Sequence, residues 1–184
     1  MKEEAWVQTY TGQIFRPFDV QLEMISIEDI AHSLSNTCRF NGHSKFFYSV
    51  AEHCVEASFI VPRKAALGAL LHDAAEAYVG DFVGPLKKYF PAFQELEFNI
   101  LQKIHERYSV ILTKEDITAI HQADMCLLET ERRQVMNDCT KDWYWKNDIP
   151  PNPLDTKLEQ NSARYAEKRF LQRFAELYNG GENI

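Results

Sequence analysis

The stretch A-A-L-G-A-L-L-H-D-A-A-E-A-Y, residues 65–78, decides the fold class of this protein. Its first seven residues are all Ala, Leu or Gly, and Ala and Leu are strong helix formers. A helix that is apolar on every side has to be buried among other elements. We therefore predict one continuous buried helix from Arg63 to about Tyr78, within an all-α, compact helical bundle.

Three ligand-type side chains lie in the second half of this predicted helix. His72 and Glu76 are four residues apart and Asp73 and Glu76 are three apart, so a continuous helix would turn all three toward one side. Burying a polar side chain without a partner is energetically costly. These side chains therefore either share a partner or mark the point where the helix emerges into solvent.

Helical patterns continue on both sides of this stretch. Ser26 and Ser49 are each followed three residues later by an acidic residue, which is the pattern of a capping box, and Pro62 ends the second of these helices. We expect residues 1–25 to form a short arm with a small hairpin, and residues 38–47 and 143–153 to form loops. The predicted helices run from Ser26 to Leu34, Ser49 to Val61, Ala92 to Tyr108, Thr113 to Asn137 and Asp155 to Tyr178, with Gly180 and Gly181 after the last.

The composition fits one globular domain over residues 1–184, with its core at about 26–178 and only seven Gly and seven Pro to make turns. The formal net charge of −7 provides no basic surface for duplex nucleic acid, so an anionic substrate must be met by a few local cations or by a metal.

No apolar signal-peptide core follows Met1 and no segment reaches membrane-spanning length, so we expect a cytoplasmic protein without a membrane partner. The four cysteines form no C-x-x-C pair and fit reduced cytosolic thiols: Cys38, Cys54, Cys126 and Cys139.

Two further ligand-type residues interrupt apolar helix faces. Asp124 lies in the middle of an apolar stripe that includes Ile117, Ile120, Leu127, Leu128 and Val135, where a carboxylate is expected to have a cation nearby. An ion pair with Arg132 or Arg133 is the alternative to a metal. His53 lies beside the stripe of the helix that begins at Ser49, and a hydrogen bond to a backbone carbonyl would also explain it.

Together these residues supply two imidazoles and two carboxylates from three predicted helices: His53, His72, Asp73 and Asp124. Such a set suits a divalent ion that keeps open positions for water, such as Mn²⁺, Co²⁺, Fe²⁺ or Mg²⁺. Zn²⁺ also accepts these ligands, although structural zinc sites more typically contain cysteine. The combination of four residues is a stronger indication of a metal site than any one of them.

The spacing of these residues resembles that of the HD-domain metal-dependent phosphohydrolases, which have a single His, an adjacent His-Asp pair and a distant Asp. The stretches L-H-D-A-A-E-A-Y-V-G-D-F-V-G-P-L-K (71–87) and C-R-F-N-G-H-S-K-F-F-Y-S-V-A-E-H (38–53) are similar to those of the HD-type 5′-deoxynucleotidases and related bacterial and phage deoxynucleotide phosphohydrolases. The resemblance covers about Ile27 to Arg133. A lone His-Asp pair carries little weight, but H-D-x-x-E-x-x-x-x-D followed by P-L-K, with the outlying His and Asp, is specific.

The resemblance implies an all-α bundle that hydrolyses phosphate esters or anhydrides with a divalent metal. It implies that Glu76 and Asp81 handle the protons of the attacking water or the leaving group. It further implies that Arg39 and Lys87 contact the substrate phosphate, while a solvated surface position is the alternative for Lys87. His43 would line the site, and Phe40 would stack on a base or belong to the core.

The expected function is therefore hydrolysis of a nucleotide, most simply a 5′-nucleotidase acting on (deoxy)nucleoside monophosphates. A deoxynucleoside triphosphate triphosphohydrolase is the nearest alternative, because the metal motif does not specify which phosphorus is attacked. A regulatory module that binds metal or nucleotide without catalysis is a more distant one, and Glu76, Asp81 and Lys87 count against it. The sequence leaves open the base, the sugar, the metal and whether the protein is a homo-oligomer.

Overall fold

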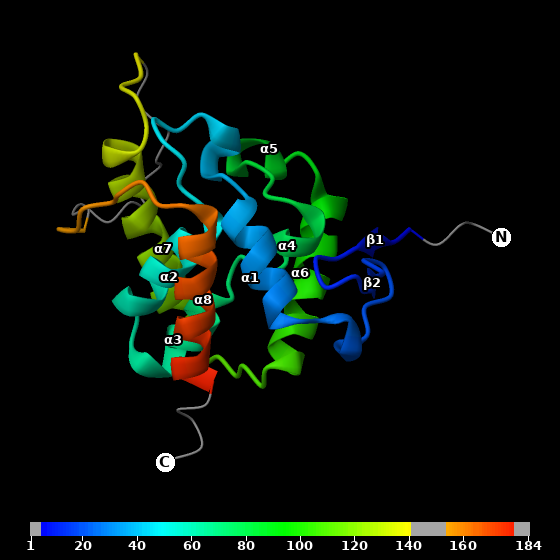
Figure 1. The fold of residues 1–184 in the computed structure, drawn as a ribbon. Helices are drawn as coiled ribbons and strands as arrows, with labels where there is room; N and C mark the ends of the chain where they lie inside the picture. The colour runs from blue at the N-terminus through cyan, green and yellow to red at the C-terminus, as the bar shows by residue number, and fades with distance from the viewer. Residues whose placement is uncertain (1–4, 141–153, 179–184) are drawn as a thin grey trace.

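The described residues, 5–140 and 154–178 of this computed structural model, form an all-α fold with one two-stranded hairpin, as predicted. Figure 1 shows the helices gathered around a common interior, with the hairpin at one side. The helices are α1 (Ile27–Asn36), α2 (Val50–Ile60), α3 (Ala66–Leu70), α4 (Glu76–Val79), α5 (Gly84–Lys87), α6 (Pro91–Arg107), α7 (Lys114–Gln134) and α8 (Ala163–Tyr178). Short 3-10 turns are η1 (Leu22–Met24), η2 (Arg39–Gly42) and η3 (Arg63–Ala65).

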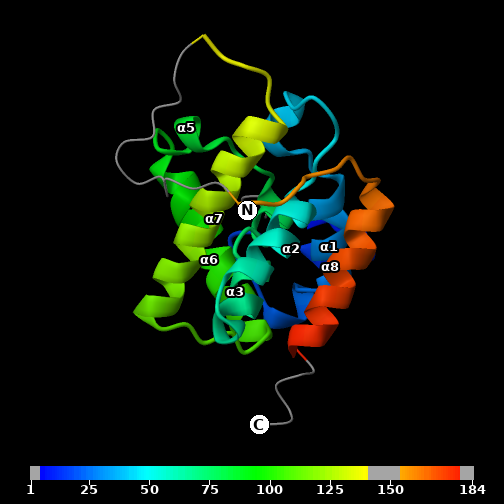
Figure 2. The ribbon, with the colours of Figure 1, turned by 90° about the vertical axis from the view of Figure 1, so that its left-hand side faces the viewer.

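Helix α2 is the central element of the fold. It packs against α1, α3, α7 and α8, and Figure 2 shows α2 and α3 between α7 on one side and α8 on the other. The predicted capping box is confirmed, because the Ser49 hydroxyl accepts from the Glu52 amide at 3.2 Å and the Glu52 carboxylate accepts from the Ser49 amide at 2.9 Å. The helix ends at Ile60, two residues before Pro62.

The N-terminal arm is part of the core. Strands β1 (Val7–Gln8) and β2 (Ile14–Phe15) pair antiparallel, and Phe15 is fully buried and stacked on Tyr78 with ring centroids 3.8 Å apart. The hairpin is tied to α1, since the Asp29 carboxylate accepts from the amide and the hydroxyl of Thr11 at 2.7 and 2.9 Å. Asp29 therefore holds the arm instead of closing the capping box predicted at Ser26.

The predicted continuous helix over residues 63–78 is wrong. The segment is divided into η3, α3, a run of turns at residues 71–75, and α4. The backbone amides of Ala74, Glu76 and Ala77 bond to carbonyls three residues earlier, which is the tighter 3-10 pattern. The break lies at His72 and Asp73, so these residues are presented from an irregular turn and not from a helix face.

Three other boundaries differ from the sequence-based expectation. Helix α8 begins at Ala163 and not at Asp155, because side chains of α7 bind the preceding backbone: Leu154 donates to Thr130 at 2.9 Å and Leu158 to Gln134 at 2.9 Å. The segment between the two predicted helices that end at Tyr78 and begin at Ala92 contains the one-turn helix α5, and α7 ends at Gln134 and not at Asn137. The expected connection at 143–153 and the glycines at 180–181 lie outside the described residues.

The predicted apolar stripe of α7 is mostly confirmed. Ile120, Leu127 and Val135 are buried, whereas Ile117 is 56% exposed and does not belong to the core. On α8 the buried side chains are those of Ala166, Phe170 and Phe174. Within the described part of the chain, no helix combines the length and the hydropathy that crossing a bilayer requires.

Candidate metal centre

Four predicted ligands converge between α2, the turn at 71–75 and α7. His53 Nε2 lies 3.3 Å from His72 Nε2, and both nitrogens face Asp73 Oδ2, at 3.8 Å from His53 and 3.3 Å from His72. Ligand atoms of these three residues all lie within 4.8 Å of one another. Asp124 Oδ1 joins them from α7, 3.1 Å from His53 Nε2 and 4.0 Å from His72 Nε2.

The other nitrogen of each imidazole has a partner that can only accept. His72 Nδ1 lies 2.7 Å from the carbonyl oxygen of Ala69, and His53 Nδ1 lies 2.7 Å from the carboxylate of Glu131. Each Nδ1 therefore carries a proton, which leaves Nε2 as the nitrogen of each ring that can offer a lone pair to a metal. The two Nε2 atoms lie 3.3 Å apart beside two carboxylates, so the donor set fits a divalent metal.

The electrostatics of the cluster also favour a cation. Burial and the charge of Arg39 disfavour protonation of His53, but the carboxylates of Glu131 and Asp124 outweigh them and raise its pKa to about 9. Burial opposes ionisation of Asp124, yet the hydrogen bond and charge of His53 lower its pKa below the ordinary value. The cluster thus stabilises positive charge, which either protons or a metal ion can supply.

The alternative explanations for these residues do not hold. Arg132 and Arg133 donate to Glu129 at 2.7 and 2.6 Å, so Asp124 is not their ion-pair partner as the sequence allowed. His53 bonds to a carboxylate through Nδ1 and not to a backbone carbonyl. The turn at His72 and Asp73 does not simply emerge into solvent, because both side chains are partly buried against α2.

Glu76 and Asp81 lie beside the cluster. Glu76 begins α4 with only 6% exposure, and its Oε2 is buried with no hydrogen-bond partner among the described residues. Burial first, and then the charges of Asp73 and Asp81, raise the pKa of Glu76. Burial also raises the pKa of Asp81, against the opposing charge of Arg39. The raised pKa of Glu76 suits this carboxyl group to hold a proton near neutral pH.

The two predicted phosphate-binding cations are already paired with carboxylates. Lys87 Nζ lies 2.7 Å from Glu97 and 3.4 Å from Glu76, so it is not a solvated surface lysine. Arg39 donates through Nε and Nη2 to Glu131 at 3.0 and 2.9 Å, and its Nη1 lies 3.8 Å from Asp73. Only the Nη1 side of Arg39 faces the cluster, because the edge formed by Nε and Nη2 is bound to Glu131.

Of the remaining predicted residues, Phe40 lies beside Arg39 and His43 is exposed. The Phe40 ring centroid is 5.4 Å from the guanidinium carbon of Arg39. His43 follows η2, and its predicted place in the lining of the site stays a prediction. Phe40 also packs on the buried cluster around Tyr48, so the core interpretation applies to part of its surface.

Glu131 is the residue that the sequence interpretation missed. It is fully buried and bonds to both His53 and Arg39. It lies within the charged run E-T-E-R-R at 129–133, which reads as a solvated helix surface. The available signal is its spacing: Glu131 follows Asp124 by seven residues, which places both on one face of a helix.

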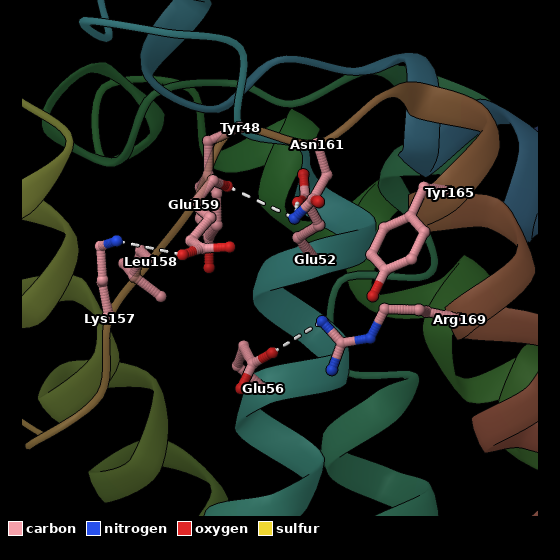
Figure 3. Close-up of a pocket in the computed structure, with 9 residues that line it drawn as sticks. All are labelled: Tyr48, Glu52, Glu56, Lys157, Leu158, Glu159, Asn161, Tyr165 and Arg169. Atoms are coloured by element: carbon pink, nitrogen blue, oxygen red, sulfur yellow. Dashed lines mark hydrogen bonds and ion pairs between the residues drawn. The ribbon is translucent and has the colours of Figure 1, made fainter.

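A separate pocket of about 150 Å³ lies between α2, α8 and the segment before α8 (Figure 3). Its charged side chains are paired with one another: Arg169 with Glu56 at 2.9 Å and Lys157 with Glu159 at 3.1 Å. Glu52 adds a third acid, held by Asn161 at 2.9 Å. With three carboxylates against two cations and none of the four predicted ligands in its wall, this pocket is unsuited to an anionic substrate.

Two curated proteins are similar in sequence to this chain over most of their length. The uncharacterized protein YfdR of Escherichia coli (strain K12) is 37% identical over 173 residues, which are 94% of this chain and 96% of that protein. The uncharacterized protein RCAP_rcc00048 of Rhodobacter capsulatus is 32% identical over 145 residues, 72% of this chain and 74% of that protein. The chain belongs to the YfdR family. No protein-family model matches the chain, and the names of the two relatives state no activity.

Proposed function

We propose that this protein is an HD-type, metal-dependent phosphohydrolase that acts as a 5′-nucleotidase on (deoxy)nucleoside monophosphates. The observation that supports it is the convergence of the two His Nε2 atoms with Asp73 and Asp124 at one point. His53, His72, Asp73 and Asp124 would hold the metal. A divalent ion, when bound, supplies Lewis acidity that activates water at neutral pH and neutralises negative charge on phosphoryl oxygens.

The chain's own side chains divide the remaining tasks. In the net reaction a new P–O bond forms from water, the ester P–O bond breaks, and one proton passes from the water to the leaving oxygen. Glu76 is suited to hold that proton, because its buried Oε2 has no other partner among the described residues and its pKa is raised. Asp81, with a raised pKa of its own, is the second candidate for this role.

Arg39 and Lys87 provide positive charge beside the cluster, and ion pairs hold both side chains in place. Arg39 is held by Glu131 with Nη1 toward Asp73, and Lys87 is held between Glu76 and Glu97. In a protein of net charge −7, such local cations are needed to attract a phosphate. We therefore assign both to electrostatic stabilisation of the phosphoryl group, with Arg39 acting through Nη1 as a single donor.

The test is a phosphate-release screen of metal-free protein with Mn²⁺, Co²⁺ or Mg²⁺ added, over nucleoside mono-, di- and triphosphates. His72→Ala and Asp73→Ala should lose both bound metal, by elemental analysis, and turnover, while their helical circular dichroism persists. His121→Ala is the matched control, because it removes an exposed histidine from α7 three residues before Asp124. This control should keep metal and turnover.

Each outcome of the screen separates the candidate functions. Release of orthophosphate from monophosphates supports the 5′-nucleotidase. Release of intact triphosphate from deoxynucleoside triphosphates would replace it with the triphosphohydrolase. Stoichiometric metal with no release from any nucleotide would leave a non-catalytic binding module.

A further inference from the structure

Glu131 has no place in the predicted ligand set, yet its carboxylate is fully buried directly behind the metal centre. Its two oxygens serve different partners. Oε1 lies 2.7 Å from Nδ1 of His53, and Oε2 accepts from Nε and Nη2 of Arg39 at 3.0 and 2.9 Å. A buried carboxylate shared in this way fixes both partners, because neither can turn away without leaving a charge unpaired.

The contact with His53 determines which ring nitrogen faces the metal. A carboxylate oxygen accepts and cannot donate, so His53 must carry its proton on Nδ1. Nε2 is then the nitrogen that can offer a lone pair to a metal, 3.1 Å from Asp124 Oδ1 and 3.3 Å from His72 Nε2. For His72, the backbone carbonyl of Ala69 fixes the proton on Nδ1 in the same way. For His53, the position of the proton depends on the side chain of Glu131 alone.

The contact with Arg39 holds a second group over the same site. The Arg39 side chain is only 12% exposed, and with Nε and Nη2 engaged by Glu131 its Nη1 is directed toward Asp73 Oδ2 at 3.8 Å. Glu131 thereby connects α7 to both α2 and η2. One carboxylate aligns a metal ligand and the nearest arginine together.

We propose that Glu131 is the positioning residue of this centre: it orients His53 for metal binding and holds Arg39 beside the metal. This inference rests on the metal-binding part of the proposed function and not on the identity of the substrate. Groups that orient a metal-binding histidine typically contribute about 10- to 100-fold to metal affinity. Glu131 therefore has a measurable effect on metal binding in the absence of any nucleotide.

The first experiment is titration of metal-free Glu131→Gln protein with Mn²⁺ by calorimetry. An amide has one accepting and one donating end, whereas His53 Nδ1–H and Arg39 both need an acceptor. One of the two must therefore be displaced, and we expect Mn²⁺ to bind about 10- to 100-fold more weakly than to wild type. In the Zn²⁺-loaded protein, the downfield proton signal of His53 Nδ1–H should move upfield or disappear.

Glu129→Gln is the matched control. Glu129 is on the same helix, is 5% exposed and also bonds to arginines, but its partners Arg132 and Arg133 follow it on α7 itself. This variant should lose thermal stability and keep both the Mn²⁺ affinity and the His53 proton signal. A purely structural role for Glu131 would produce the same result as this control.

A second variant covers the case in which Glu131→Gln does not fold. Replacing both members of the buried pair, as Arg39→Met with Glu131→Leu, leaves no unpaired charge and is well tolerated in other proteins. His53 still loses its acceptor there, so weaker Mn²⁺ binding is expected again. Wild-type Mn²⁺ affinity in a folded Glu131 variant overturns the positioning role and leaves the proposed function intact. A wild-type protein that binds no metal overturns both.

Discussion

At the scale of single residues, the proton of Glu76 links the stability of the fold to pH. In the metal-free protein, burial and the neighbouring acids raise its pKa from 4.5 to about 9. The unfolded chain therefore releases this proton first as the pH rises, and the free energy of unfolding falls between about pH 5 and pH 9. The buried Glu76 thus destabilises the metal-free fold at neutral pH but not in acid.

Glu76→Gln should remove this penalty. We expect the melting temperature of the metal-free variant to exceed that of wild type by an amount that grows from pH 5 to pH 8.5, measured in a chelator by circular dichroism. The variant should still bind Mn²⁺ and should lose about 10²- to 10⁴-fold in turnover, because Gln cannot exchange a proton with water. A difference in melting temperature that does not change with pH would show that Glu76 is ionised in the fold.

The convergence of the four proposed metal ligands could be predicted from the sequence because three of them interrupt an apolar pattern. His53, His72 and Asp124 are anomalous where they stand, and the structure brings them together with Asp73. Glu131 could not be recognised in the same way, since it lies among charged neighbours and its spacing of seven residues from Asp124 is its one sequence signal; its partners show that it faces inward. A buried charge is conspicuous in a sequence only when its surroundings are apolar.

At the scale of elements, helix starts that depend on local contacts could be predicted from the sequence. The capping boxes that open α2 and α7 join residues three positions apart, and for α2 this local pattern was sufficient to predict the box. The break at residues 71–75 coincides instead with long-range contacts of His72 and Asp73 to His53, and no local signal interrupts the run of Ala and Leu. A turn of 3-10 type inside a helical segment often marks a functional position, and here the turn holds two of the proposed metal ligands.

Ser49→Ala tests how far the cap of α2 supports the centre. Ser49 is buried at the N-terminus of α2, one turn before His53. Loss of its side-chain acceptor should lower the free energy of unfolding by about 0.5–2 kcal/mol, measured by urea denaturation. We also expect weaker Mn²⁺ binding, since α2 carries His53 and the cap fixes its first turn.

Thr113→Ala is the matched change at the capping box of α7. Its box is equally complete, but Asp124 lies about three turns further along the helix. It should lower stability by a similar amount and leave Mn²⁺ affinity unchanged. If both variants weakened Mn²⁺ binding equally, the effect would reflect general loosening of the fold and not the cap of α2.

At the scale of the whole molecule, α8 supports the site without contributing a ligand. Its buried residues Ala166, Phe170 and Phe174 share one core with Phe15 of the N-terminal hairpin. Arg173 adds polar contacts to α2, donating to the Ser58 hydroxyl at 3.0 Å and to its carbonyl at 3.1 Å. The N-terminal hairpin and α8 thus share one core with α2, which carries the proposed ligand His53, so we predict that the domain and the metal site unfold together.

Phe170→Ala tests this coupling. Removing a fully buried Phe should lower the free energy of unfolding by about 3–5 kcal/mol, because the ring is lost and a cavity remains. Tyr165→Ala on the exposed face of the same helix should change it by no more than about 0.5 kcal/mol. In urea titrations of Mn²⁺-loaded Phe170→Ala, metal release and loss of helicity should coincide at one midpoint, lower than that of wild type. Because no ligand lies on α8, metal release at a lower urea concentration than the loss of helicity would show that the centre unfolds independently of the core behind it.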